Sequence, residues 1–143
     1  MALTANEALK TKGENDIVDF DIDATTHIYR GSIVGITAAG YLTTAAPVAT
    51  TAMARAGVAR EEVNNTGAAG ADSAEVYTAG EFLLTGSGFA VSDVGDIVYA
   101  SADDTITLSA TTGANLNVTL GYVTKFVSAT QVWVKLLPFG VQS

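Results

Sequence analysis

The chain has 143 residues, with seven lysines and arginines against fifteen acidic residues and a net charge of -8. This length fits one domain, and a hydrophobic content of 48% indicates a folded chain with its own core. An acidic surface repels nucleic-acid phosphates, so we expect no direct nucleic-acid partner. Without cysteine the chain has no disulfide, thiolate nucleophile or cysteine-based zinc site. No apolar run approaches the roughly 20 residues that span a bilayer, so we expect no membrane partner.

The first sixteen residues are polar, with Leu3 and Leu9 as the sizeable apolar side chains. We predict a flexible N-terminal arm over residues 1–16 and a single β-rich domain over residues 17–143. The chain does not start with a basic stretch followed by an apolar one. We therefore expect no signal peptide, and synthesis in a cytoplasm.

Alternating side chains mark the start of the predicted domain. In IVDFDID the apolar and acidic residues alternate, which is the period of a half-buried strand. Asp19, Asp21 and Asp23 then form one solvated face. A calcium loop beginning at Asp19 would need glycine at its sixth position and glutamate at its twelfth, where this chain has Ala24 and Arg30. We therefore interpret these aspartates as the solvent-exposed face of a strand, and we predict no metal site.

The rest of the chain repeats short β-rich runs that end in Gly, Asn, Asp or Thr. HIYRGSIVGIT predicts two short strands around Gly31, and GYLTTA predicts the return strand of a hairpin. Further strands are predicted in SAEVYTAGEFLLTG, GDIVYA, DTITLSA, NVTLGYVTKFV and TQVWVKLLP. NNTGAAGAD and ATTGAN predict flexible loops, and Pro47 and Pro138 fall where strands should be over. The pattern predicts an all-β fold, a small β-barrel or β-sandwich of short antiparallel strands.

One segment, TTAMARAGVAREEVNN, contains the densest charge cluster of the chain, which consists of Arg55, Arg60, Glu61 and Glu62. Its composition favours a helix, yet Val58 and Val63 would lie on different sides of that helix. As a strand, the segment places Ala54, Ala56 and Val58 on one inward face. We predict the strand, with the charged residues on its solvated or subunit-facing side.

Few residues are candidates for catalysis. His27 is the one histidine, and with no GxSxG motif in the chain we interpret it as a surface or edge-strand residue. Glu61 and Glu62 are neighbours, and on a strand they point to opposite faces, so they cannot act as a paired acid and base in one cleft. The glycines of GSGFA and TGAAGA lack the lysine of a phosphate-binding loop. We predict no enzyme, no catalytic residue and no cofactor.

Acidic turns and aromatic side chains leave two further hypotheses open. Two pairs of acids flank the predicted IVYA strand at turns, where aspartate caps backbone amides: Asp93 and Asp96, and Asp103 and Asp104. A cation that bridges these turns is the alternative. The five tyrosines and Trp133 could form a sugar-binding platform, but aromatics spread singly over strands are usually packing residues.

Eight motifs follow one another over about residues 28–138: IYRGSIVGIT, GYLTTA, AGVAREEV, EVYTAGEFLLTGSG, VGDIVYAS, TITLS, LGYVTKF and VWVKLLP. Each is a packing or turn signature. Their order and spacing resemble those of the small capsid decoration, or cement, proteins of tailed bacteriophages.

This resemblance implies a compact β unit that assembles as a homotrimer on the outer surface of an icosahedral head. It implies binding to the major capsid protein, stabilisation of the head, and a place in the virion after synthesis in the host cytoplasm. The candidate capsid or subunit contacts are Leu3, Leu9, Arg55, Arg60, Glu61 and Glu62. The alternatives are another virion component such as a tail tube or head-tail connector, a carbohydrate-binding surface module, or a small enzyme that uses His27.

Overall fold

The computed structural model describes residues 17–49 and 51–138. The predicted arm, with Leu3 and Leu9, lies outside them. Regular structure in the described residues is β, except for one short 3-10 helix, η1 (Val91–Asp93). They include no helix with the length and apolar character that crossing a bilayer requires. The predicted all-β class is confirmed.

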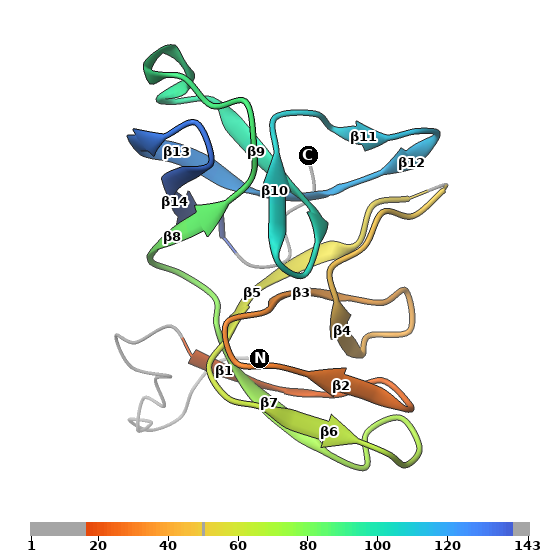
Figure 1. Ribbon diagram of the computed structural model, residues 1–143. Coiled ribbons are helices and arrows are strands. Elements are labelled where there is room, and N and C mark those ends of the chain that lie inside the picture. Colours follow the sequence, from red (N-terminus) through yellow and green to blue (C-terminus); the bar gives the residue numbers. More distant parts are fainter. Residues whose placement is uncertain (1–16, 50, 139–143) are drawn as a thin grey trace, which may run out of the picture.

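Two five-stranded antiparallel sheets form most of the fold, one above the other in Figure 1. The N-terminal sheet has the spatial order β1 (Ile17–Asp21), β7 (Ser73–Tyr77), β5 (Ala54–Ala59), β3 (Ile33–Ile36) and β4 (Leu42–Thr44). The C-terminal sheet has the order β10 (Thr105–Thr107), β9 (Ile97–Ala102), β13 (Val118–Ser128), β14 (Gln131–Leu136) and β8 (Glu81–Thr85). Both sheets keep open edges, so of the two predicted architectures the sandwich-like one is confirmed and the closed barrel is wrong.

Two small ribbons complete the strands: β2 (Thr26–Ile28) with β6 (Val63–Asn65), and β11 (Thr111–Thr112) with β12 (Asn115–Leu116). The second ribbon corrects the flexible loop predicted for ATTGAN. The Asn117 amide holds this ribbon, since it donates to the Ser109 carbonyl at 3.1 Å and accepts from the Thr112 hydroxyl at 2.9 Å. The predicted hairpin of β3 and β4 is confirmed, with Val34 opposite Thr44.

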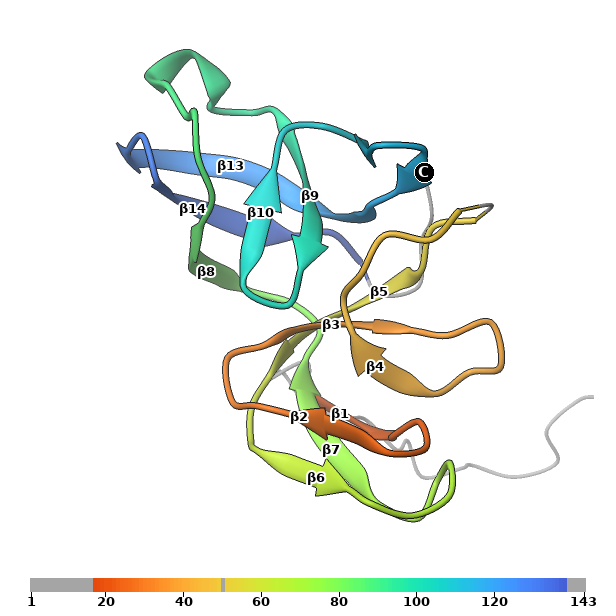
Figure 2. The same ribbon diagram turned by 45° about the vertical axis from the view of Figure 1, so that its right-hand side comes forward.

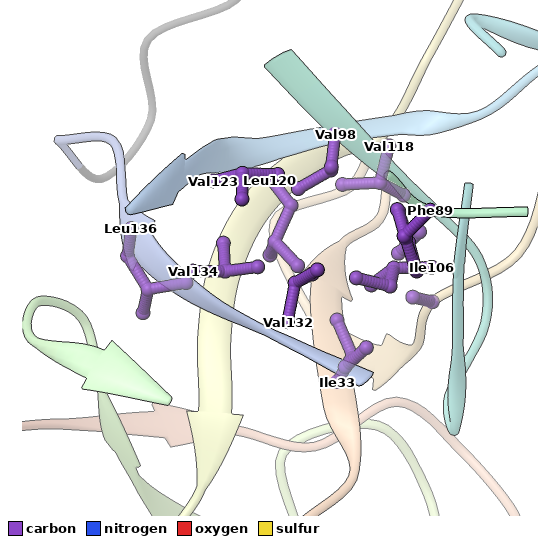
Figure 3. Packing of buried hydrophobic residues seen from close by; sticks show 12 residues of the cluster. Ile33, Phe89, Val98, Ile106, Val118, Leu120, Val123, Val132, Val134 and Leu136 are labelled. Carbon is purple, nitrogen blue, oxygen red and sulfur yellow. The ribbon is translucent and has the colours of Figure 1, made fainter. Parts of the chain in front are cut away.

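Two hydrophobic clusters fill the interior, one for each sheet. Figure 3 shows the larger cluster, in which Val118, Leu120 and Val132 of the C-terminal sheet meet Ile33 of β3. The next residue, Val34, belongs to the smaller cluster of the N-terminal sheet, because successive strand residues point to opposite faces. β3 therefore contributes to both cores, and with β5 it runs between the two halves of the molecule (Figure 1 and Figure 2).

Burial along β1 follows the predicted alternation. Asp19 and Asp21 are exposed, while Ile22, just after the strand, is fully buried in the smaller cluster. Phe20 packs against the same cluster. The solvated acidic face is confirmed for Asp19 and Asp21, whereas Asp23 lies beyond the strand and is half-buried.

A buried amide organises the loop that follows β6. Asn65 is fully buried, and its amide nitrogen donates to the Asp23 carbonyl at 2.9 Å and to the Ala68 carbonyl at 3.0 Å. Its amide oxygen accepts from the Gly67 N–H at 3.1 Å. Part of the segment predicted as a flexible loop is thus fixed by one side chain.

Replacing Asn65 with alanine is expected to lower the free energy of unfolding by about 2 kcal/mol, because buried backbone groups lose their partners. Urea unfolding measures the change. Asn64→Ala is the matched control, since Asn64 is exposed on the same strand and should lose far less. Equal losses for the two variants would contradict the anchoring role.

Candidate functional site

Three members of the charge cluster, Arg60, Glu61 and Glu62, lie just after the end of β5. Arg60 Nη1 lies 2.8 Å from Glu75 Oε1 on β7, and the Arg60 N–H donates to the Glu75 carbonyl at 3.0 Å. Glu61 Oε2 accepts from the Glu75 N–H at 2.9 Å. The Tyr77 hydroxyl and, after it, the Glu75 carboxylate raise the pKa of Arg60. These contacts fasten the bend after β5 to β7.

Glu62 has a different partner. Its Oε2 atom lies 2.8 Å from His27 Nε2 on β2. The His27 ring stacks on the Tyr29 ring, with 4.0 Å between centroids and 22° between the ring planes. His27 is partly exposed and lies opposite Asn64 in the small β2–β6 ribbon. The interpretation of His27 as a surface strand residue is confirmed.

The two adjacent glutamates do not converge on one cleft. Glu61 turns to the backbone of β7, and Glu62 turns to His27 on β2. An acid and base pair must face one substrate from two sides. The expected strand position of the two glutamates is wrong, because both lie on the bend between β5 and β6. That they take no part in catalysis, and that the chain is no enzyme, stay predictions.

Arg55 corrects the sequence interpretation of β5. Its residue surface is 3% exposed, and its guanidinium donates from Nε to the Pro138 carbonyl at 3.0 Å and from Nη1 to the Thr119 carbonyl at 3.2 Å. Burial lowers the pKa of Arg55, although a guanidinium stays protonated in proteins. The prediction that Arg55 lies on a solvated or subunit-facing side is wrong, because β13 covers the face of β5 that points away from the smaller cluster. Arg55 instead ties the two sheets together.

A groove of about 650 Å³ opens beside the charge cluster, where β5, β7 and β8 approach one another. Its apolar lining includes Val58 and Phe82, and its charged lining includes Arg30, Arg60 and Glu75. Apolar area next to paired charges suits contact with another protein chain. The groove holds no histidine or cysteine, and its Arg60 and Glu75 side chains neutralise each other.

Three of the acidic residues at turns accept hydrogen bonds from nearby residues in the chain. Asp93 Oδ2 accepts from the Ala90 N–H at 2.8 Å, and Asp104 Oδ1 accepts from the Thr105 hydroxyl at 2.9 Å. Asp23 Oδ1 accepts from the Ala24 N–H. Over residues 17–49 and 51–138, no three acidic or histidine side chains gather in a group that could hold a metal ion.

Among the described residues, the two most exposed aromatic side chains lie on different parts of the molecule. Tyr29 is 54% exposed beside the β2–β6 ribbon, whereas Trp133, at 36%, lies on the C-terminal sheet. The other tyrosines, numbers 41, 77, 99 and 122, are half-buried, as expected of packing residues. An extended sugar-binding surface would need several such rings side by side.

Sequence reasoning missed one surface. Trp133 and Lys135 alternate with buried residues on β14, so both point away from the core of the C-terminal sheet. Lys125 on β13 and Leu83 on β8 lie opposite Trp133 on either side. The alternation in TQVWVKLLP indicated the outward face, but the neighbours of Trp133 depend on strand order and register.

Comparisons with known proteins give one structural neighbour. No protein-family model matches the chain, and no curated protein matches it. The chain is similar in structure to the head fiber gp8.5 N base in bacteriophage phi29. The TM-score is 0.49 at 15% sequence identity, over 89% of this chain and 99% of that chain.

Proposed function

We propose that this chain is a capsid decoration protein of a tailed-phage head, a homotrimer that binds the outer surface of the shell and stabilises it. The observation that carries the proposal is the ordered series of eight motifs that resembles this family. Several described strands overlap those motifs: AGVAREEV contains most of β5, VGDIVYAS contains most of β9, and VWVKLLP contains most of β14.

Surface chemistry fits a binding role. The net charge of -8 repels nucleic acid, so the shell side that faces the genome is unsuitable and the outer side is suitable. Arg60, Glu61 and Glu62 are on the surface and remain candidate contacts to the major capsid protein or to another subunit. Arg55 is no longer a candidate contact, because its guanidinium is buried between the sheets.

Binding is additive in this proposal. Leu3 and Leu9 of the N-terminal arm are the apolar anchors, and burying each side chain contributes about 1 to 3 kcal/mol. A trimer engages three sites at once, which slows dissociation because one subunit's release leaves the other two bound. Each head contact can therefore be weak while the occupancy of the head stays high.

The experiment adds purified protein to expanded empty heads and counts bound copies per head. Replacing Leu3 and Leu9 with aspartate, or deleting residues 1–16, is expected to lower occupancy at least tenfold at subsaturating protein, with an unchanged urea midpoint. Val91→Asp is the control for adding one charge at an exposed apolar position, since Val91 is 67% exposed on η1. Unchanged occupancy in the arm variants would contradict the anchoring role.

Electron microscopy of the free protein separates the proposal from its rivals. A decoration protein should form trimers, whereas ring-shaped hexamers would indicate a tail-tube protein. Glycan-array binding by the isolated protein would favour a carbohydrate-binding module instead.

A further inference from the structure

One face of the C-terminal sheet combines exposed apolar groups with cations. We call it the basic face, and its residues are Leu83, Ile97, Tyr122, Lys125, Trp133 and Lys135. Register aligns them across four strands: Trp133 lies between Leu83 and Lys125, and Tyr122 lies between Lys135 and Ile97. The intervening residues of β14, Val132 and Val134, belong to the larger cluster, so these side chains point away from the core.

The apolar members of the basic face are unusually exposed for a sheet. The exposed fraction is 42% for Leu83, 39% for Ile97 and 36% for Trp133. Clustered exposed apolar side chains mark contact surfaces, and tryptophan is the residue type most enriched among those that dominate binding. A shallow hollow of about 360 Å³ lies next to Trp133, between Glu81 and Lys125. A hollow of this shape next to an exposed tryptophan can receive a side chain of a protein partner.

The charge of the basic face is opposite to that of the whole chain. Lys125 and Lys135 are the two lysines that the described residues contain, and both lie here on an acidic molecule. Neither forms an ion pair with a described residue. The nearest carboxylate by register, Glu81, accepts a hydrogen bond from the Thr124 hydroxyl at 2.6 Å. Glu81 keeps its negative charge opposite Lys135 and offsets part of the positive charge of this face. Because neither lysine is held in an ion pair with a described residue, both can still pair with acidic groups of a partner.

The same chain carries the complementary surface on its other sheet. We call it the acidic face, formed by Asp19 and Asp21 on β1. Asp19 lies opposite Glu75 in the β1–β7 ladder, but Arg60 pairs with Glu75, so the two aspartates supply the uncompensated negative charge. Asp19 and Asp21 are exposed, and the Ser73 hydroxyl donates to Asp19 Oδ2 at 3.1 Å. Ile17 and Tyr77 supply partly buried apolar area beside these acids.

We propose that the basic face of one copy docks on the acidic face of a second copy, with Lys125 and Lys135 against Asp19 and Asp21. A second copy fits better than an unrelated protein because one chain presents both halves of the contact on different sheets. Such a head-to-tail contact can repeat, since every bound copy still offers its other face, and it forms a ring when the rotation between copies closes. The inference rests on the self-association required by the proposed function, and it names the surfaces.

Charge reversal tests the contact. Lys125→Glu with Lys135→Glu places acids against acids, and Asp19→Lys with Asp21→Lys places bases against bases. Each double variant is expected to weaken self-association at least tenfold by light scattering and sedimentation. The variant carrying all four substitutions should regain association, because the charges are then exchanged and again complementary. Trp133 is the sole tryptophan, so the tryptophan emission of the protein reports on this face alone. Association buries the ring, so the emission should shift to shorter wavelength in the wild type and in the fourfold variant.

Controls separate specific pairing from net charge. Asp103→Lys with Asp104→Lys changes the net charge by +4 at a turn, as Asp19→Lys with Asp21→Lys does. Thr66→Glu, Ser92→Glu, Thr111→Glu and Ala114→Glu together change it by -4 at exposed positions, as Lys125→Glu with Lys135→Glu does. Both control variants should associate like the wild type. The inference is overturned if the double variants associate normally, if the fourfold variant stays dissociated while folded, or if the wild type is monomeric.

Head binding is measured separately by occupancy on purified heads. Normal occupancy together with unaffected association in the charge variants would leave the proposed function intact and overturn this contact. If the wild type associates through these faces but does not bind heads, the proposed function is overturned and the contact is supported.

Discussion

Replacing Arg55 with methionine is expected to lower the free energy of unfolding by about 2 to 4 kcal/mol, because two carbonyls lose a charged donor between the sheets. The donors are Nε, toward Pro138, and Nη1, toward Thr119. Methionine keeps much of the apolar stem of arginine, so the change tests the hydrogen bonds more than the packing. Urea unfolding followed by circular dichroism measures the difference.

Arg60→Met is the matched control for this prediction. Arg60 lies five residues along the chain, and its guanidinium pairs with Glu75 on the surface. Solvent screens an exposed pair, so the urea midpoint should move much less than for Arg55. Equal shifts for the two arginines would show that Arg55 does not join the sheets.

Gly57→Ala is expected to destabilise the protein by about 3 kcal/mol or more, since steric overlap and backbone strain act at the same position. A Cβ atom at Gly57 would lie 1.9 Å from the Tyr77 carbonyl oxygen on β7. The φ angle of Gly57 is +144°, a region that side chains avoid. Relief of the overlap would require β5 and β7, which are paired at Val58 and Tyr77, to separate. A fall in the urea midpoint, or loss of soluble protein, measures the effect.

Gly113→Ala provides the comparison for Gly57. Gly113 has a φ angle of +60°, and no atom lies within 4 Å of a Cβ built there. Backbone strain alone should then lower the free energy of unfolding of Gly113→Ala, by about 1 to 2 kcal/mol. If both alanine variants lost the same stability, the close approach of β5 to β7 would not be the cause.

The strands could be predicted because each carries its own local pattern. Alternation in IVDFDID placed Asp19 and Asp21 outside, and turn residues such as Gly31 separated the short runs. Strands could also be predicted in preference to helices, because the segments contain β-branched residues and lack apolar residues at helical spacing. The choice of strand for residues 54–59 is confirmed by β5. Its predicted inward face is wrong, because Ala59 joins Ala56 in the smaller cluster while Val58 lines the groove, and the register between β3 and β5 shifts here.

Long-range arrangement could not be predicted in the same way. Alternation defines two faces of β5 but does not reveal that β13 covers the second one, and this is why Arg55 was misplaced. Whether a sheet closes depends on which strands occupy its edges, a property of the whole chain. The ribbon around Gly113 depends on Asn117, a polar side chain outside the turn itself.

The candidate surfaces were predictable in part. The surface positions of His27, Glu61 and Glu62 followed from local sequence, but their partners did not, because Glu75 and His27 are distant in the chain from the residues they contact. The basic face needed the register that sets Leu83 and Lys125 beside Trp133.

The pairing of β8 with β14 has a consequence for how the protein is made. β8 lies at an edge of the C-terminal sheet, and its one ladder partner is β14, the last described strand. A ribosome adds about 5 to 20 residues each second, so Phe82 and Leu84 of β8 emerge seconds before their partner strand exists. During that interval a nascent chain exposes an unpaired apolar edge, which favours aggregation. Yield of soluble protein should therefore respond to translation speed and to chaperone supply more than the stability of the finished fold would indicate.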